Sequence, residues 1–99
     1  MMGMIATAMP PARRVPPEKP APANRVERMK KRLRANVARN VLRIRTDAGL
    51  SQKQLSERAN LSQTYVSQIE SARNRNFGVD VIAMLAVALD VAPSDLTAD

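Results

Sequence analysis

The chain has 99 residues and a net charge of +7, and it contains neither cysteine nor histidine. Its length allows one domain, and the missing residue types exclude disulfides, thiolate chemistry, the usual zinc ligands and the commonest general base. We therefore expect no enzyme activity, no metal site and no cofactor. The two aromatic residues, Tyr65 and Phe77, are too few for a platform that stacks single-stranded bases.

The positive charge is concentrated in one part of the chain. Residues 1–24, 25–45 and 46–99 carry net charges of +2, +8 and −3. A basic block beside a slightly acidic remainder is typical of a protein that binds a polyanion at one end. A solvated helix face is the more common origin of a charge run, so this reading stays open beside it.

No segment predicts a membrane helix or an export signal. The longest apolar run, from Val81 to Leu89, is far shorter than the roughly 20 residues that span a bilayer. The N-terminus does not combine a basic start with an apolar core. We therefore expect a cytoplasmic protein with no membrane contact.

The N-terminal third divides into a tail and a basic extension. Six of the seven prolines lie in residues 10–22, where fixed φ angles and missing N–H donors oppose a helix, so residues 1–23 are predicted to be a disordered Pro/Ala-rich tail. Residues 24–35 follow as a basic extension, with Asn24 and Glu27 at capping distance. Its apolar residues recur at helical spacing: Val26, Met29 and Leu33. Whether the extension is a separate helix or part of the next one remains open.

From Asn36 the pattern predicts a helix of about twelve residues. Its apolar stripe consists of Val37, Val41, Ile44 and Ala48. Gly49 follows, where a helix end favours a positive φ. Ser51 and Gln54 then form the Ser-x-x-Gln pattern of a capping box and predict a second helix up to Ala59.

A turn of about three residues then leads into a third helix. Asn60 tolerates the left-handed conformation and can end the second helix, and Ser62 can cap the third. Two helices joined so tightly must cross at a steep angle. The expected core residues around this turn are Leu55, Leu61, Val66 and Ile69.

The other face of the third helix carries uncharged hydrogen-bonding side chains: Gln63, Thr64, Ser67 and Gln68. A glutamine can present a donor and an acceptor together to adenine in the major groove, and serine or threonine can contact several base edges or a thymine methyl. This face is therefore chemically suited to reading bases in double-stranded DNA.

Residues 36–96 resemble the Cro/CI-type (XRE-like) helix-turn-helix family of phage repressors and bacterial regulators. The stretches that carry the resemblance are IRTDAGLSQKQLSERANLSQTYVSQIE and IAMLAVALDVAPSDL. The resemblance implies an all-α fold, a compact five-helix lambda-repressor-like domain over residues 36–99. It also predicts a short final helix at residues 93–96.

The resemblance assigns roles to residues at matching positions. It implies that Gln52 contacts DNA phosphate at the start of the second helix and that Ser62 lies close to the DNA backbone. It places base reading on the four polar residues of the third helix. The loop after that helix would run along phosphates through Arg73, Asn74 and Arg75, although a solvated turn is the alternative. Arg45 and Glu70 match a partly buried structural ion pair.

The sequence departs from the family pattern at a few positions. Ser56 stands where alanine usually packs between the two helices, and Asn60 replaces the usual turn glycine. The loop after Glu70 is one residue longer than the common pattern, and Ser71 and Ala72 stand where a glycine is frequent. We expect the fold to tolerate these changes.

The fourth helix, from Val79 to Leu89, has one polar residue, Asp80. We expect its core face to consist of Ile82, Leu85, Ala86 and Leu89. A second stripe would then need another cover: Val81, Met84 and Ala88. We predict that this stripe lies at a homodimer interface; the alternative is that the N-terminal helix folds back over it.

These patterns predict a sequence-specific DNA-binding transcriptional regulator that reads a palindromic operator as a dimer and associates with the nucleoid when bound. It would act as a repressor or as a restriction-modification controller-like protein. The alternative is an antitoxin or other interaction module with autoregulatory DNA binding, whose protein partner would contact the N-terminal segments.

Overall fold

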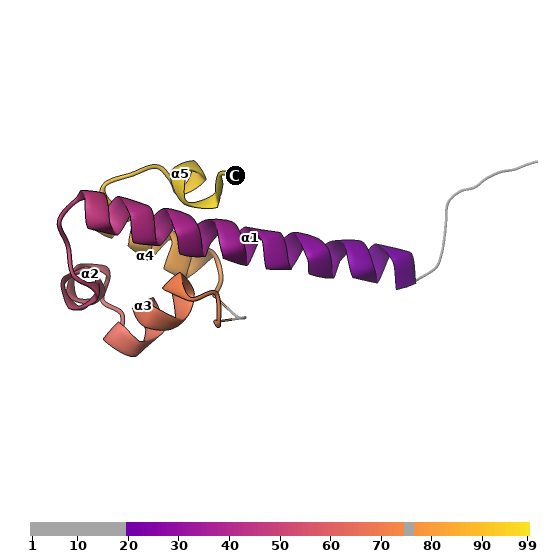
Figure 1. Cartoon of the computed structure of the whole chain (residues 1–99), viewed down its shortest axis with the longest axis horizontal. Coiled ribbons are helices and arrows are strands. Elements are labelled where there is room, and N and C mark those ends of the chain that lie inside the picture. The colour runs from indigo at the N-terminus through magenta and orange to yellow at the C-terminus, as the bar shows by residue number, and fades with distance from the viewer. Residues whose placement is uncertain (1–19, 75–76) are drawn as a thin grey trace, which may run out of the picture. The chain divides into compact units, whose positions relative to one another are not determined.

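The computed structural model describes residues 20–74 and 77–99, with side chains from Asn24 onward. These residues form five helices and no strand (Figure 1). The helices are α1 (Pro20–Asp47), α2 (Gln52–Ala59), α3 (Gln63–Glu70), α4 (Val79–Leu89) and α5 (Pro93–Thr97). The predicted all-α, five-helix fold is confirmed. The chain divides into two units, residues 1–30 and residues 31–99, and the helix-turn-helix lies wholly in the second.

The first helix begins earlier than its sequence predicts. We placed residues 20–23 in a disordered tail and expected a helix start at Asn24, but α1 begins at Pro20 and continues without a break to Asp47. Proline costs little in the first helical turn because the N–H groups there have no partner within the helix. The basic extension is therefore part of the next helix, which was one of the two open alternatives. The rest of the predicted tail, residues 1–19, lies outside the described residues.

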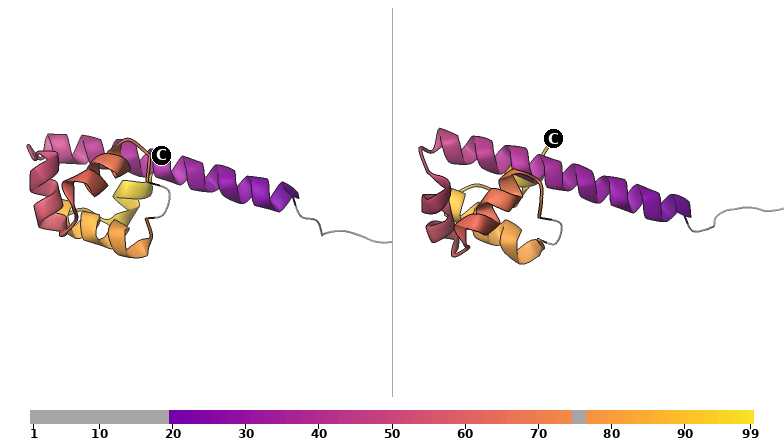
Figure 2. Two further views of the ribbon diagram at one scale, coloured as in Figure 1. Left: turned by 90° about the horizontal axis from the view of Figure 1, so that it is seen from below. Right: turned by 60° about the horizontal axis from the view of Figure 1, so that its bottom comes forward.

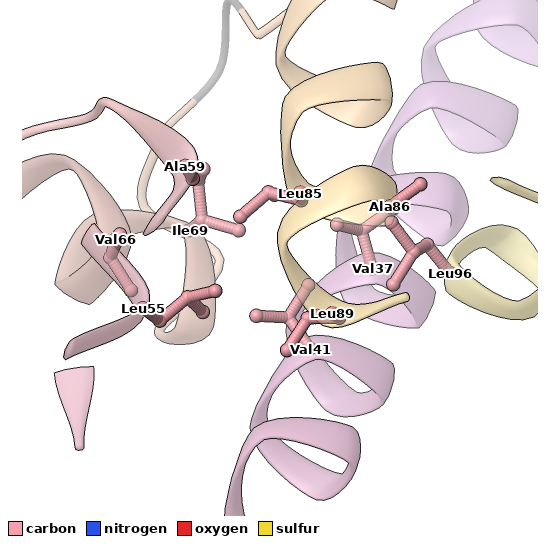
Figure 3. Close-up of a cluster of buried hydrophobic side chains, with 10 residues drawn as sticks. All are labelled: Val37, Val41, Leu55, Ala59, Val66, Ile69, Leu85, Ala86, Leu89 and Leu96. Atoms are coloured by element: carbon pink, nitrogen blue, oxygen red, sulfur yellow. The ribbon is translucent and has the colours of Figure 1, made fainter. Parts of the chain in front are cut away.

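Every helix contributes to the core of the second unit (Figure 3). The buried apolar residues are Val37, Val41, Leu55, Ala59, Val66, Ile69, Leu85, Ala86, Leu89 and Leu96. Burying each of the larger side chains contributes on the order of 2 kcal/mol. Ile44, Leu61 and Ile82, which we predicted in the core, are half-buried at its edge. Ala48 is exposed, so the first apolar stripe ends one turn earlier than predicted.

Four of the helices end in the same way. A residue with positive φ follows each end: Gly49 (74°), Asn60 (58°), Ala72 (61°) and Asp90 (56°). In each case the next N–H donates to a carbonyl five residues back, at 2.8 to 3.0 Å. This pattern is the Schellman motif, which gives the last carbonyls of a helix a partner. The left-handed conformations predicted for Gly49 and Asn60 are confirmed.

Helices α2 to α5 follow one another in the second unit (Figure 2), and the connection from α4 to α5 is only residues 90–92. Helix α2 packs against both α3 and α4, and α4 packs against α5. The connection from α2 to α3 is only residues 60–62, as predicted. None of the described helices has the length and apolar character needed to cross a membrane.

Two asparagines on α1 bind the C-terminal backbone. Asn36 and Asn40 are only 6% and 4% exposed. The amide of Asn40 donates to the carbonyls of Leu96 and Ala98, at 3.0 and 2.8 Å. The amide of Asn36 donates to the carbonyl of Thr97 at 3.2 Å. We call this set of contacts the C-terminal clasp; it satisfies the carbonyls of the last two residues of α5 and of Ala98, which lack a helical partner.

Asp99 adds a charged contact to the clasp. Its carboxylate accepts hydrogen bonds from Arg32 at 2.8 Å and from the amide of Asn36 at 2.8 Å. The hydrogen bond from Arg32, and then the one from Asn36, lower the pKa of Asp99 below its usual value. Because Asp99 is exposed, water screens this pair and the buried asparagines carry most of the clasp's stability.

Candidate nucleic-acid interface

A capping box fixes the start of α2. The Oγ atom of Ser51 accepts a hydrogen bond from the N–H of Gln54 at 3.0 Å, and the Ser51 N–H donates to Oε1 of Gln54 at 2.8 Å. Two N–H groups that would otherwise lack a partner are satisfied, and such a cap contributes about 1 kcal/mol. The capping box that the sequence predicted is confirmed.

The turn between α2 and α3 depends on local residue chemistry at both ends. Asn60 adopts the left-handed conformation that ends α2. Ser62 then caps α3, because its Oγ atom accepts a hydrogen bond from the N–H of Tyr65 at 3.0 Å. Leu61, between them, is half-buried against the core. The left-handed conformation of Asn60 and the cap formed by Ser62, both predicted from the sequence, therefore set the geometry of this turn.

The predicted polar face of α3 is exposed, and its opposite face is buried. Val66 and Ile69 are 0% and 1% exposed. The exposed side chains are those predicted to read bases: Gln63, Thr64, Ser67 and Gln68. Within residues 20–74 and 77–99, none of these four side chains makes a hydrogen bond or an ion pair. The core thus fixes the helix while leaving four side chains available for an outside ligand.

A buried ion pair ties α3 to the end of α1. The guanidinium of Arg45 donates to both carboxylate oxygens of Glu70, at 2.6 and 3.0 Å, and also to the carbonyl of Leu50 at 2.7 Å. The two charged side chains are only 12% and 5% exposed. The hydrogen bond that Arg45 donates to Glu70 is the main cause that raises the pKa of Arg45. The pair implied by the family resemblance is confirmed.

Gln52 joins the same cluster. Its Nε2 atom donates to Oε1 of Glu70 at 3.0 Å, and the residue is half-buried. One residue of α3 thereby holds both the end of α1 and the first turn of α2. The side-chain amide donor of Gln52 is occupied within the protein, so any phosphate contact at this position has to use its backbone N–H or its remaining amide atoms.

Ser56 fits the angle between α2 and α3, where alanine was expected. It is 4% exposed, and a buried hydroxyl without a partner would cost about 1–3 kcal/mol. Here its Oγ atom donates to the carbonyl of Lys53 at 2.7 Å. The hydroxyl is therefore satisfied within its own helix, which explains why the fold accommodates serine there.

The loop after α3 is only partly described. Arg73 is exposed, whereas Asn74 is half-buried. The backbone N–H groups of both residues donate to the carbonyl of Gln68, at 2.8 and 3.3 Å. Arg75, the third predicted phosphate contact, lies outside the described residues. Ala72 adopts positive φ at this point, which costs an L-residue about 1–2 kcal/mol.

The predicted dimer stripe on α4 needs a correction. Val81 and Ala88 are half-buried and pack against the core, so they do not form a free apolar face. The most exposed apolar residues of α4 are Val79 and Val87, at 84% and 82%. They lie on the side opposite Leu85 and Leu89. Because α4 is apolar almost all around, the sequence pattern did not distinguish these two stripes.

Met84 is the third residue of the predicted dimer stripe. It is half-buried and lines a shallow hollow of about 320 Å³ between α2 and α4. The hollow is lined by Arg58, Ala59, Asn60, Ala83, Met84 and Val87. Elsewhere among the described residues, no group of three or more histidine, cysteine, aspartate or glutamate side chains could hold a metal ion.

Comparison with known proteins agrees with this architecture. The helix-turn-helix family model matches residues 41–96, more than half of the chain. The structure of a hypothetical transcription factor, NHTF from Neisseria, is 38% identical, covers 67% of this chain and 75% of that chain, and has a TM-score of 0.64. A comparison with curated protein sequences finds no match.

Two restriction-modification controller proteins are also similar. C.AhdI from Aeromonas hydrophila is 32% identical, with 64% of this chain and 94% of that chain covered and a TM-score of 0.61. A mutant of C.Esp1396I is 27% identical, with 61% and 75% covered and a TM-score of 0.58. The crossed helices α2 and α3 on a five-helix body define the helix-turn-helix class of proteins. The chain belongs to the Cro/CI-type (XRE-like) helix-turn-helix family of DNA-binding regulators.

Proposed function

We propose that this protein is a transcriptional regulator that binds a palindromic operator in double-stranded DNA as a homodimer. It would repress a promoter or act as a restriction-modification controller-like protein. The observation that carries this proposal is the polar face of α3, where four uncharged side chains are exposed on a helix fixed by buried Val66 and Ile69.

In this proposal α3 lies in the major groove. Gln63 and Gln68 are long enough to offer a donor and an acceptor to adenine, and each such bidentate contact supplies about 1–3 kcal/mol of discrimination. Thr64 and Ser67 are shorter, so they suit a single base edge or a thymine methyl. The buried Arg45–Glu70 pair supports this reading because it restricts the orientation of α3 relative to α1 and α2.

Contacts to the DNA backbone would orient the protein on the groove. Ser62 is exposed at the start of α3, and Gln52 lies at the start of α2, where helix N–H groups favour a phosphate. Arg73 is exposed just after α3 and would add a positive charge beside the groove. We also assign Asn74 and Arg75 to this backbone contact, as the family resemblance implies. The basic part of α1 would add affinity that does not depend on sequence.

Selection of bound sequences from a random duplex pool at fixed salt tests base reading. We expect a palindromic consensus with half-sites about 34 Å apart. Gln63→Ala and Gln68→Ala should each lose information at defined positions, because each removes a bidentate base contact. Ser67→Ala should weaken one position, whereas the same change at Ser94, which is exposed on α5, should leave the consensus intact. The proposal would be contradicted if the bound pool showed no sequence enrichment and if none of the three α3 variants changed DNA binding.

Oligomeric state provides a separate test. We propose that the exposed side of α4 mediates the homodimer, with Met84 at its edge and Val87 at its centre. Val87→Glu and Met84→Glu should each give a folded monomer, because a buried unpaired carboxylate opposes association. Sedimentation measures the state, and Ala92→Glu, on an exposed residue between α4 and α5, is the control. A dimer that survives both α4 changes would place the interface elsewhere.

A further inference from the structure

The first part of α1 exposes a row of apolar side chains. Val26, Met29 and Leu33 are 56%, 54% and 41% exposed. Their spacing of three and four residues places them along one side of a helix. Single apolar residues on a surface are ordinary, but such a row is the pattern by which one helix packs against another. We call these three residues the α1 apolar row.

Basic side chains border this row on both sides. Arg25 and Arg32 lie along one edge of the row, and Lys30 and Arg34 lie along the other. Residues 24–34 contain six basic residues and one acidic residue, Glu27, which pairs with Lys30 at 3.7 Å. Like charges three or four residues apart repel each other and destabilise an isolated helix. Among the described residues, Arg32 also pairs with Asp99 at 2.8 Å, so four of the six basic side chains have no ion pair and the apolar row has no cover.

We infer that residues 24–34 of α1 are a docking surface for an acidic amphipathic helix of a partner protein. The apolar side of that helix would cover the α1 apolar row. Its carboxylates would lie against Arg25 and Arg34, and would compete with Glu27 and Asp99 for Lys30 and Arg32, whose present ion pairs are exposed to water. Opposite charges beside an apolar seam select the partner. This docking does not use α3, so it goes beyond base reading and can fail or succeed independently of it.

Charge selects among the possible occupants of this surface. A second copy of the same segment would bring basic residues against basic residues along both edges of the row, which opposes pairing. DNA phosphates would satisfy the positive charge but leave the apolar row in water. A helix lying on a membrane has a broad apolar face, whereas this row is one residue wide at each turn. An acidic amphipathic helix complements both the charge and the row.

The test measures binding of the full chain to a fluorescent synthetic peptide. The peptide consists of about three heptads with leucine at the a and d positions and glutamate at the e and g positions. A second peptide has the same composition in scrambled order. We expect the chain to bind the amphipathic peptide and not the scrambled one. Met29→Gln/Leu33→Gln should weaken binding by about tenfold or more, since it removes two apolar contacts but no charge.

Leu42→Gln is the matched control. Leu42 is 43% exposed on the same helix, close to the exposure of Leu33, but it lies outside the row. Its replacement should leave peptide binding unchanged. Because all three residues are exposed, each variant should retain the helical circular dichroism of the native chain, and loss of binding then reports on the surface itself.

Other outcomes would overturn the inference. Failure of the native chain to bind the amphipathic peptide would do so directly. Equal binding by Met29→Gln/Leu33→Gln, or equal binding of the scrambled peptide, would show that charge alone causes the attraction. The same variants are also tested for binding to random-sequence duplex DNA and to vesicles of neutral and anionic phospholipid. If Met29→Gln/Leu33→Gln weakens binding to DNA or to vesicles more than it weakens binding to the peptide, the apolar row would instead contact that DNA or membrane.

Discussion

Helix α3 and the first part of α1 both present polar side chains, but they differ in charge and in support. The exposed face of α3 is uncharged, and its other side is anchored by buried Val66 and Ile69. Residues 24–34 of α1 are strongly basic, and their apolar residues are exposed. Short neutral groups on a fixed backbone can distinguish one base edge from another, whereas long charged groups attract any polyanion. The two surfaces therefore suit different tasks.

The largest expected effect comes from breaking the ion pair between Arg45 and Glu70, which holds α3 against α1. Arg45→Ala would leave the carboxylate of Glu70 buried without its cation and should lower the free energy of unfolding by about 3–5 kcal/mol. Urea denaturation measures this change. Arg45→Met/Glu70→Leu removes both charges and should be less harmful. The base preference of the remaining folded protein should be unchanged; an altered preference at full stability would show that Arg45 acts on DNA.

A smaller effect should come from the charge of α1. Arg28→Gln/Lys31→Gln removes two exposed basic residues that do not border the apolar row. If both contact phosphates, the slope of log affinity against log salt should decrease by about 1.8, and binding near physiological salt should weaken by roughly tenfold. The ranking of operator sequences should stay the same. Titrations at several salt concentrations test this, and a changed ranking would show that α1 reads bases.

The smallest expected effect concerns the end of α3. Ala72→Gly should raise the free energy of unfolding by up to about 1 kcal/mol, because glycine adopts positive φ without strain. The same substitution at Ala35, exposed within α1, should instead lower it by about 1 kcal/mol. Thermal or urea unfolding of both variants gives the comparison. Equal signs for the two changes would contradict the strain that we assign to Ala72.

Short-range chemistry could be predicted from the sequence. Ser51 and Gln54, Asn60 and Ser62 each act within a few residues, so their residue types were sufficient to place the ends of α2 and α3. The exposed face of α3 followed from the alternation of apolar and polar residues over two turns. The start of α1 was missed because prolines oppose a helix interior but not its first turn.

Features that depend on distant contacts could not be predicted. Asn36 and Asn40 are poor helix formers inside a long helix, which is the one local signal that they bind something, but their partners are far away in the sequence. Ala72 carries no signal for positive φ. On α4, Val79 and Val87 differ from Val81 only in position, and the packing of the whole unit decides which of them is exposed.

The C-terminal clasp has a consequence for the order in which the chain can fold during synthesis. Its asparagine–carbonyl contacts join residues that are 56 to 61 positions apart, so the amides of Asn36 and Asn40 cannot bind these carbonyls until residues 96–98 have left the ribosome. Until then, the side-chain amides of Asn36 and Asn40 are exposed to water, and the hydrophobic core beside them is incomplete. The packing of α1 in the second unit is therefore completed only after residues 96–98, which are made later than α3, have reached Asn36 and Asn40.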